Sequence, residues 1–478
     1  MNIDYKQLRV GLIGLGLEAY WEQFEGLEQR LLGYLSEVER KIASPSRVTF
    51  NFGLVDTPQK AVETGHRCRR SDIDILLVYV TTYALSATVL PVILRAKVPV
   101  VLLNLQPGDA IEYEKFNRMA DRTAMTGEWL AWCSACPMPE IANVLGRLDV
   151  PFRQVTGTLD GGNECWLELG QWLRAAEVVH ALSHSRLGLM GHYYSGMLDI
   201  ATDLAQVSGR FCIHIEHLEV DELSGLRGGV DDAAIQKKLE AFGEFFAVGE
   251  DCSAEELARA ACTGAALDRF VEANDLDLLA YYYKGTGVVE NEETMSSIIL
   301  GASMLTGRGV PVAGEYEVKN VIAMKIMDLL GAGGSFSEYY AMDFAADLVL
   351  MGHDGPGHIG IAEGRIKVRP LQVYHGKVGR GLSVEMQVKH GPVTLLSVVE
   401  DRESGFKLLV AEGESVSGPI LEIGNTNSRY RFPTGARGLV EQWNAHGPAH
   451  HCAIGLGHTA SQLAKVADLL GLGFVQVC

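Results

Sequence analysis

The sequence predicts an α/β fold with two doubly wound α/β domains followed by a C-terminal β-rich, barrel-like domain. Apolar strand-like runs alternate with amphipathic helix-like stretches in the first third of the chain, and again from about residue 186. From about residue 365 the pattern changes to short β-rich runs separated by Gly, Asp and Ser. Buried strands that alternate with helices are typical of parallel sheets, whereas short, closely spaced strands are typical of antiparallel sheets and barrels.

The first predicted domain covers residues 1–180. Its expected strands are Leu8–Leu15, Val48–Val55, Ile73–Val80 and Val98–Leu105, and its expected helices are Glu18–Ile42, Pro58–His66 and Ser86–Arg95. Each strand candidate is a short apolar run, and each helix candidate has apolar residues at helical spacing. This alternation predicts a parallel sheet that is covered by helices on both faces.

The remaining chain is predicted to form a central α/β domain, residues 181–330, and a β-rich domain, residues 331–478, that carries metal ligands. The central domain is expected to begin with a strand at Arg186 and to contain the strands Cys212–Glu219 and Leu276–Tyr283 and the helix Asp231–Phe246. The β-rich domain is expected to contain the strands Val368–Val373, Leu382–Val388, Val393–Val399 and Lys407–Glu412, then the helix Ala460–Leu470 and the strand Phe474–Val477.

Composition narrows the class of protein. The chain has 478 residues, which is enough for two to four domains, and 47% of them are hydrophobic. Its formal net charge is −19, whereas nucleic acids and anionic membranes both attract basic surfaces, so neither is expected as a partner. No apolar run is long enough to span a bilayer, and no signal peptide is expected at the start. These features predict a cytoplasmic enzyme.

The nine cysteines are an odd number, which is typical of free thiols in a reducing compartment. Cys133 and Cys136 are the closest pair in the sequence. A redox or zinc role would require a second pair or a thioredoxin-like context, and neither is present. Both are therefore predicted to be ordinary thiols.

One glycine motif is compatible with a second class of enzyme. Gly14-Leu-Gly16-Leu-Glu-Ala19 follows a strand and formally fits the dinucleotide fingerprint, in which a pyrophosphate lies at a helix N-terminus. The acidic residue that should follow after about 20 residues is missing, because the nearest strand-end acid is Asp56. A tight turn without a nucleotide is the preferred interpretation, and an NAD-dependent sugar dehydrogenase is the alternative.

Carboxylates and histidines stand at strand ends and in loops of the second half of the chain, at Glu315, Glu338, His353, His358, His450 and His451. Glu315 follows an apolar segment where a strand should end, and ligands bind α/β sheets at such ends. Carboxylates with neutral imidazoles suit a divalent ion of the Mn²⁺, Co²⁺ or Mg²⁺ type rather than structural zinc, which recruits thiolates. The alternative is that the carboxylates lie at helix starts or on the surface and the histidines are polar loop residues. Spacing alone leaves that alternative open.

At these residues the sequence resembles the L-arabinose isomerase family, within the wider fucose/arabinose isomerase group. The family segment Gly-Glu-Gly-Asp-Trp-Lys is matched by Gly314-Glu315-Tyr-Glu-Val-Lys319, and Gly-Gly-Thr-Ser-Phe-x-Glu-Asp-Tyr is matched by Gly333-Gly-Ser-Phe-Ser-Glu338-Tyr-Tyr. The family's strand-end histidine falls on His353, and its Gly-Gly-Ala-His-His segment falls on Gly447-Pro-Ala-His450-His451. The resemblance implies that the ion, most simply Mn²⁺, is bound by Glu315, Glu338, His353 and His451.

The resemblance also implies an activity, metal-dependent aldose–ketose isomerisation of a pentose or related sugar through a cis-enediol. Glu315 and Glu338 would then carry the acid/base work as well as binding the metal, and His450 would contact sugar hydroxyls. Further candidates for a sugar pocket are Tyr20, Trp21, Gln23 and Tyr339, each with core packing as its alternative. His358 and His375 are candidates for additional ligands, although loop histidines without a function are more common. Family members are hexamers, so a homo-oligomer is expected.

Two segments depart from the family pattern. The family's Ala-His-Gly-x-Arg-Glu-Phe, whose His reaches a neighbouring subunit's site, is matched by Ala135-Cys136-Pro-Met-Pro-Glu140-Ile, so Cys136 replaces that His. The family's Gly-Ser-Gln-His-Leu-Tyr-Gly is replaced by Leu15-Gly-Leu-Glu-Ala-Tyr20-Trp21-Glu-Gln23. Because both segments help to hold sugar, the sequence does not identify the substrate. A third class of function is a sugar-binding protein, since two α/β lobes can close on a sugar.

Overall fold

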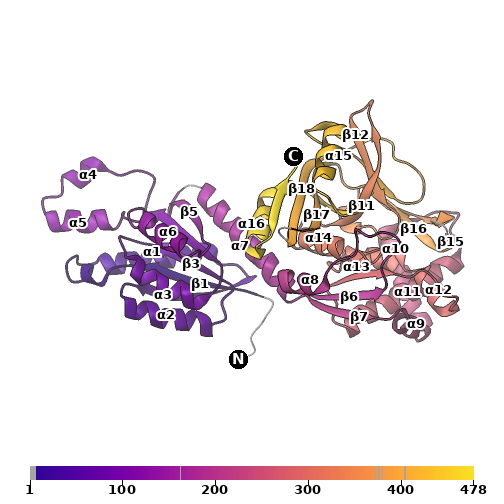
Figure 1. Cartoon of the computed structure of the whole chain (residues 1–478), viewed down its shortest axis with the longest axis horizontal. Helices are drawn as coiled ribbons and strands as arrows, with labels where there is room; N and C mark the ends of the chain where they lie inside the picture. Colours follow the sequence, from indigo (N-terminus) through magenta and orange to yellow (C-terminus); the bar gives the residue numbers. More distant parts are fainter. Residues whose placement is uncertain (1–6, 162, 372, 375–376, 379, 403–404) are drawn as a thin grey trace. The chain divides into compact units, whose positions relative to one another are not determined.

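The computed structural model describes residues 7–161, 163–371, 373–374, 377–378, 380–402 and 405–478. The chain forms two compact units, Met1–His180 and Ala181–Cys478. Figure 1 shows both units, with labels on many of their helices and strands. Among the described residues, no helix is long and apolar enough to cross a membrane.

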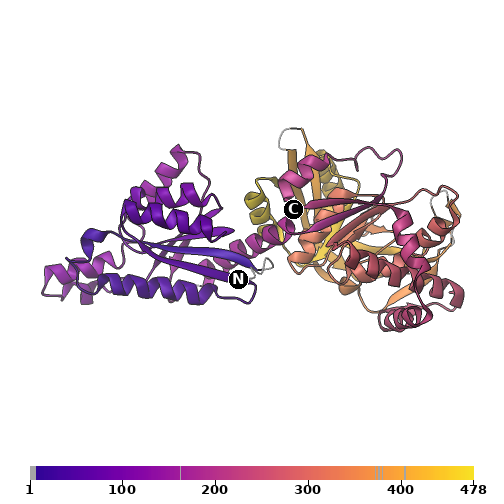
Figure 2. The same cartoon turned by 90° about the horizontal axis from the view of Figure 1, so that it is seen from below.

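Unit 1 contains a five-stranded sheet in the order β2-β1-β3-β4-β5, and every pair of neighbouring strands is parallel. The strands are β1 (Leu8–Leu15), β2 (Arg47–Val55), β3 (Ile75–Val80), β4 (Val100–Gln106) and β5 (Arg153–Thr158). The helices are α1 (Leu27–Ile42), α2 (Pro58–Arg70), α3 (Ser86–Ala96), α4 (Tyr113–Asn117), α5 (Arg122–Leu130), α6 (Met138–Arg147) and α7 (Asn163–Ser183). Helices lie on both faces of this sheet (Figure 2), which confirms a doubly wound α/β fold.

The predicted helix Glu18–Ile42 is shorter in the structure. A 3-10 turn, η1 (Glu18–Tyr20), follows β1, and α1 begins only at Leu27. Gly16 lies against the Trp21 ring, since an added Cβ on Gly16 would come within 2.8 Å of it. The Trp21 indole N–H donates to Asp56 Oδ2 at 2.8 Å. The Gly14–Ala19 motif therefore does not open an α-helix, which the dinucleotide fingerprint requires.

Unit 2 begins with a four-stranded parallel sheet in the order β10-β9-β6-β7. These strands are β6 (Arg186–Gly191), β7 (His214–Leu218), β9 (Leu278–Tyr282) and β10 (Val312–Ala313). The helices of this part are α8 (Leu204–Phe211), α9 (Val220–Gly228), α10 (Asp232–Phe245), α11 (Ala254–Ala273), α12 (Val289–Met295), α13 (Ile299–Thr306) and α14 (Val318–Leu329). This parallel sheet and its helices confirm the second α/β region that the sequence predicts.

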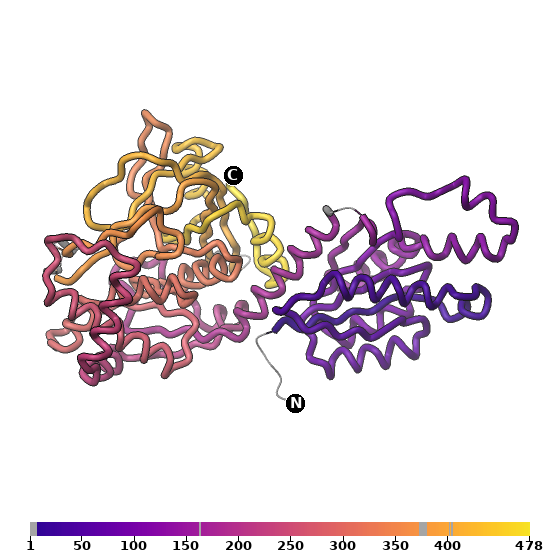
Figure 3. Tube along the Cα trace, turned by 180° about the vertical axis from the view of Figure 1, so that it is seen from behind, coloured from indigo at the N-terminus to yellow at the C-terminus, as the bar shows by residue number. Residues whose placement is uncertain are grey.

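The later strands of unit 2 form a closed six-stranded barrel with the strand order β17-β20-β11-β12-β19-β18 and a final pairing of β18 with β17. Its strands are β11 (Ser335–Asp343), β12 (Leu348–His353), β17 (Gly391–Asp401), β18 (Gly405–Val416), β19 (Thr426–Arg431) and β20 (Cys452–Leu456), with β21 (Gly473–Gln476) paired beside β18. Figure 3 traces this part of the chain, coloured orange to yellow, within unit 2. The predicted barrel-like domain is confirmed.

Smaller elements complete unit 2. They are the sheet strands β8 (Phe246–Val248), β13 (Ile366–Pro370) and β16 (Leu382–Glu385), the pair β14 (Val373–Tyr374) and β15 (Lys377–Val378), the turn η2 (Ile359–Ile361), and the helices α15 (Gly435–Ala445) and α16 (Ala460–Leu470). One hydrophobic core contains residues from both sides of residue 330, including Val312 of β10 and Val349 of β12. The division of residues 181–478 into two domains at residue 330 stays a prediction.

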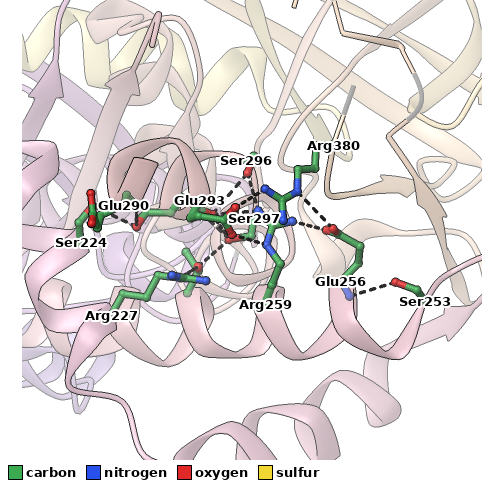
Figure 4. A network of polar contacts seen from close by, with 12 residues as sticks. Ser224, Arg227, Ser253, Glu256, Arg259, Glu290, Glu293, Ser296, Ser297 and Arg380 are labelled. Atoms are coloured by element: carbon green, nitrogen blue, oxygen red, sulfur yellow. Dashed lines mark hydrogen bonds and ion pairs between the residues drawn. The ribbon is translucent and has the colours of Figure 1, made fainter. Parts of the chain in front are cut away.

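A polar network ties helices α9, α11 and α12 to one another (Figure 4). The buried Arg259 of α11 donates to Glu293 Oε2 at 2.7 Å and to Ser296 Oγ at 2.6 Å. Arg380, which precedes β16, pairs with the same Glu293 and, at 3.6 Å, with Glu256. A buried cation is stable only when it is paired and hydrogen-bonded, and Arg259 meets both conditions. The network therefore links these three helices to one another.

Candidate metal centre

Three of the four predicted metal ligands come from neighbouring strands of the barrel, in the order β20, β11, β12. Glu338 of β11 lies opposite Gly352, the residue before His353 at the end of β12. On the other side of β11, Ser337 pairs with Cys452, so His451 stands just before the start of β20. The antiparallel register therefore brings together side chains that are more than a hundred residues apart in the sequence.

Glu315 reaches the same place from the parallel sheet. It follows the end of β10, where both Glu315 (φ 57°) and Tyr316 (φ 63°) adopt the left-handed backbone conformation. The Tyr316 N–H donates to Tyr281 O at 2.9 Å, and the Tyr194 N–H donates to Glu315 O at 3.4 Å. Left-handed non-glycine residues cost free energy and are concentrated at functional sites, where the surrounding structure enforces them. This turn aims the Glu315 carboxylate toward the barrel histidines.

The ligand atoms form two overlapping groups around His451. Glu315, His353 and His451 offer atoms that all lie within 4.8 Å of one another, and so do Glu338, His450 and His451. The Glu315 carboxylate lies 3.4 Å from His451 Nε2 and 4.0 Å from His353 Nε2. The rings of His353 and His451 both contact Phe336, with centroid separations of 4.5 and 4.4 Å. Phe336 thus supports both imidazoles from one side.

The donor set fits a divalent cation. Among the described residues, Glu315 Oε2 and His451 Nε2 are buried and have no hydrogen-bond partner, although a buried polar atom normally has one. Burial lowers the pKa of His451 well below its usual value, and the nearby His353 and His450 lower it further, so the imidazole is neutral. Neutral imidazoles and carboxylates bind metal ions of the Mn²⁺, Co²⁺ and Mg²⁺ type. A cation between these atoms would satisfy both of them.

Burial also acts on Glu315. It raises the pKa of this carboxyl, and the neighbouring Glu338 and Asp354 raise it further, whereas His353 and His450 lower it. A carboxylate whose pKa is raised toward neutrality is a better proton acceptor at neutral pH. The site therefore combines potential metal ligands with a potential general base.

His450 lies beside this group rather than within it. Its Nε2 pairs with Glu338 Oε2 at 2.6 Å, and this hydrogen bond is the main reason why the pKa of His450 is raised. Its backbone N–H donates to Asp199 Oδ2 at 2.8 Å. The buried Lys319 donates to the backbone oxygens of Asp199 and Ala201, at 2.5 and 3.3 Å. The loop after β6 is thereby anchored beside the site.

Three residues near the site were missed by the sequence prediction. Glu317 is fully buried, and its Oε2 lies 3.3 Å from His451 Nδ1. The sequence did indicate Glu317, because this acid stands two residues after Glu315, at the position where the family segment has Asp. Tyr340 lies at a bulge in β11, and burial, together with Glu338 and Asp354, raises its pKa. Local sequence pattern does not reveal a bulge, so Tyr340 could not be found that way, whereas Asp354 directly follows the predicted ligand His353 in the sequence.

The predicted Tyr339 is placed differently. It packs against the hydrophobic core of unit 2, and the groups that contribute to its raised pKa, after burial, are Cys452 and Cys478. Successive residues of a strand point to opposite faces, so Tyr339 faces away from Glu338. A sugar-binding role for Tyr339 stays a prediction, and Tyr340 is the tyrosine near Glu338.

The other predicted residues belong to neither of these two groups. Within unit 1, the Tyr20 ring contacts Phe24 with centroids 5.7 Å apart, and Gln23 donates to Ala19 O at 2.6 Å. Trp21 bonds Asp56, as described above, and sugar binding by these three residues stays a prediction. His358 is buried with Nε2 3.7 Å from Asp328 Oδ1, and it belongs to neither group of ligand atoms. His375 lies outside the described residues.

Comparison with known proteins identifies the part of unit 2 that contains Glu338, His353 and His451. Residues 333–473 match the family model of the L-arabinose isomerase C-terminal domain. An L-arabinose isomerase of Nocardioides sp. is 25% identical over 354 residues, which are 71% of this chain and 68% of that protein. One from Herpetosiphon aurantiacus is 24% identical over 71% of this chain and 69% of that protein, and one from Aeromonas salmonicida is 22% identical over 69% and 68%.

The matched domain carries Glu338, His353 and His451, and the matches to the three isomerases cover 69–71% of the chain at low identity. The predicted resemblance is therefore confirmed: residues 333–473 match the C-terminal domain of L-arabinose isomerase, and the chain is a distant relative of L-arabinose isomerases.

Proposed function

We propose that this chain is a metal-dependent aldose–ketose isomerase that acts on a pentose or related sugar through a cis-enediol. The observation that carries the proposal is the buried group of Glu315, His353 and His451 next to Glu338. The similarity to L-arabinose isomerases supports isomerisation, and the two buried atoms without hydrogen-bond partners support a metal. We further propose Mn²⁺ as the native ion, a homo-oligomeric and hexameric assembly, and a cytoplasmic location.

Isomerisation moves a proton between C1 and C2 of the sugar. A bound divalent ion would supply Lewis-acid stabilisation of the negative charge that develops on the two sugar oxygens. Glu315 and Glu338 would hold the ion together with His353 and His451. Either carboxylate would take the proton from one carbon and return it to the other, and the raised pKa of Glu315 suits this work. His450, held by Glu338 and Asp199, would donate to a sugar hydroxyl.

A panel of aldoses tests the activity. The chelated protein should form no ketose, and added Mn²⁺ should restore ketose formation on at least one aldose. In deuterated water, the product should carry deuterium at the carbon that receives the proton, because a carboxylate-borne proton exchanges with solvent. Full activity after chelation would contradict metal dependence, and product without deuterium would contradict the enediol route. No ketose from any aldose would contradict the isomerase proposal.

A nicotinamide-dependent sugar dehydrogenase is disfavoured by the turn at Gly16. The Trp21 ring occupies the space beside this glycine, and Trp21 uses Asp56 as its hydrogen-bond acceptor. A pyrophosphate requires free backbone N–H groups at a helix start, and α1 begins only at Leu27.

A further inference from the structure

A buried histidine, His358, lies outside the two ligand groups of the candidate metal centre. It is 5% exposed, and in the part of the chain that the structure describes neither of its ring nitrogens has a hydrogen-bond partner. Its backbone N–H donates to Ser335 Oγ at 3.3 Å, and the N–H of Gly357 donates to Ser303 Oγ at 3.1 Å. The backbone is thus fixed, whereas the imidazole lacks the partner that a buried polar group normally has.

One carboxylate faces this imidazole. His358 Nε2 lies 3.7 Å from Asp328 Oδ1. A hydrogen bond from nitrogen to oxygen spans about 2.7–3.2 Å, so this separation is too long for one. Two ligand atoms that lie about 2.0–2.2 Å from the same tetrahedral ion are about 3.4 Å apart. The two side chains therefore need to approach by only a few tenths of an ångström to bind a cation between them.

The surroundings of Asp328 favour a cation. Asp328 stands in the last turn of α14, where the helix dipole disfavours a carboxylate and favours a positive charge. That turn contains no basic residue. Lys325 donates instead to Gly309 O at 2.8 Å, and burial lowers its pKa, although Asp277 and Asp328 oppose this shift. A cation beside Asp328 would therefore be stabilised both by the carboxylate and by the helix end.

Two glycines flank the imidazole of His358. An added Cβ on Gly333 would come within 3.4 Å of Nε2, and one on Gly360 would come within 3.4 Å of Nδ1. Gly333 also has a left-handed backbone, with φ 78°, which favours glycine over other residues. Neither position therefore carries a side chain that would crowd the ring nitrogens. The side chain of Asp328 is 25% exposed, so it has room to rotate and admit an ion from solution.

We propose that His358 Nε2 and Asp328 Oδ1 bind a divalent cation of the Zn²⁺ type, at a site separate from the candidate metal centre. Imidazole nitrogens and carboxylate oxygens are both common Zn²⁺ ligands, and water completes the coordination. With two protein ligands, the site binds its ion less tightly than a structural site with four.

The ion would connect two elements that lead away from the candidate metal centre. Helix α14 begins directly after Glu317 and carries Asp328 near its end. The loop with His358 follows β12, which ends at His353. A cation between them would hold the end of α14 against this loop. The inference does not depend on the proposed isomerase activity.

Equilibrium dialysis of the chelated full chain against Zn²⁺, after alkylation of accessible thiols, counts the bound ions. The wild type should bind one more Zn²⁺ per chain than either His358→Gln or Asp328→Asn, because each variant lacks one of the two ligands. This difference is the same whether or not the candidate metal centre also binds Zn²⁺, so a failure of this site is distinguishable from a failure of the proposed function. His66→Gln, exposed on α2, is the matched control and should bind as many ions as the wild type.

Two further measurements test the site. Zn²⁺ should raise the melting temperature of the wild type more than that of either variant, since an ion that binds the folded chain selectively stabilises it. Wild-type crystals grown with Zn²⁺ should show an anomalous peak between His358 Nε2 and Asp328 Oδ1, a result that does not depend on how the variants fold. Equal Zn²⁺ counts in the wild type and both variants would overturn the proposal. So would Zn²⁺-saturated wild-type crystals without a peak at this position.

Discussion

His451 and Glu317 form a buried pair, with His451 Nδ1 3.3 Å from Glu317 Oε2 and both side chains fully buried. The other ring nitrogen, Nε2, faces Glu315 at 3.4 Å. A carboxylate next to Nδ1 favours the tautomer that carries the ring proton there, which leaves the Nε2 lone pair directed at the position proposed for the cation. We therefore expect Glu317 to act as a positioning residue, through His451.

Glu317→Gln should weaken Mn²⁺ binding by about 10–100-fold, because the neutral amide no longer fixes the His451 tautomer and makes the imidazole a weaker donor. Titration calorimetry of the chelated protein with Mn²⁺ measures this effect without any substrate. Glu244→Gln, at an exposed position of α10, is the matched control and should bind Mn²⁺ as the wild type does. Unchanged affinity in a folded Glu317→Gln protein would show that Glu317 does not position His451.

Glu315→Gln and Glu338→Gln should each lose ketose formation by at least about 10²–10⁴-fold, the range expected when a general acid or base is removed. Both variants should also bind Mn²⁺ more weakly, since each loses a charged ligand. Rates at saturating Mn²⁺ separate the two effects, and Glu422→Gln, exposed in the loop before β19, serves as the control. A variant that keeps its rate once Mn²⁺ is saturating would have no acid/base role.

Substrate preference should reflect Cys136, which stands where the family has a histidine. Losing a hydrogen-bond donor leaves a sugar hydroxyl unpaired at a cost of about 1–3 kcal/mol. L-arabinose should therefore be turned over poorly relative to another aldose. Cys136→His should bring the kcat/KM value for L-arabinose closer to the value for that aldose. If L-arabinose is the best substrate of a broad panel, this argument is wrong, although isomerisation itself would stand.

The protein should be oligomeric, because in the family the segment that matches Cys136 contributes to a neighbouring subunit's site. Light scattering coupled to size exclusion should give a mass several times that of one chain, with a hexamer as the expected state. A catalytically active monomer would contradict this prediction. Crosslinking from the segment around Cys136 to a second chain would locate the contact.

Glu177 of α7 should stabilise unit 1 in a pH-dependent way. Burial raises its pKa, but Ser46, Arg174 and Arg47 lower it more, so the net pKa is below the usual value. Arg47 Nε lies 2.7 Å from the carboxylate. A lowered pKa means that the ionised form stabilises the fold above the ordinary Glu pKa, and that this stability is lost as the pH falls through the lowered value.

Glu177→Gln should therefore reduce the free energy of unfolding by about 1–3 kcal/mol at neutral pH. Urea denaturation should show this difference narrowing below about pH 4, where the wild-type carboxylate also becomes protonated. Glu63→Gln, exposed on α2, is the control and should show little change at either pH. A difference that is constant with pH would mean that packing, rather than charge, explains the effect.

Much of the fold could be predicted from local pattern. The strand Leu8–Leu15 and the helix Ala460–Leu470 have the predicted bounds, because a buried strand and an amphipathic helix each follow a period that is visible in a few residues. The start of α1 was predicted nine residues too early, at Glu18 rather than Leu27. The apolar residues Tyr20, Trp21 and Phe24 mimic helical spacing, but they form a turn packed against a separate small core.

The sequence by itself determined which side chains are candidates, since Glu315, Glu338, His353 and His451 each stand in a recognisable segment. Only the tertiary structure decided how they meet. The β20-β11-β12 register places three of them side by side, and the left-handed turn after β10 brings in Glu315. Strand register and buried contacts such as Glu317 with His451 depend on residues far apart in the chain, whereas periodicity reports only near neighbours.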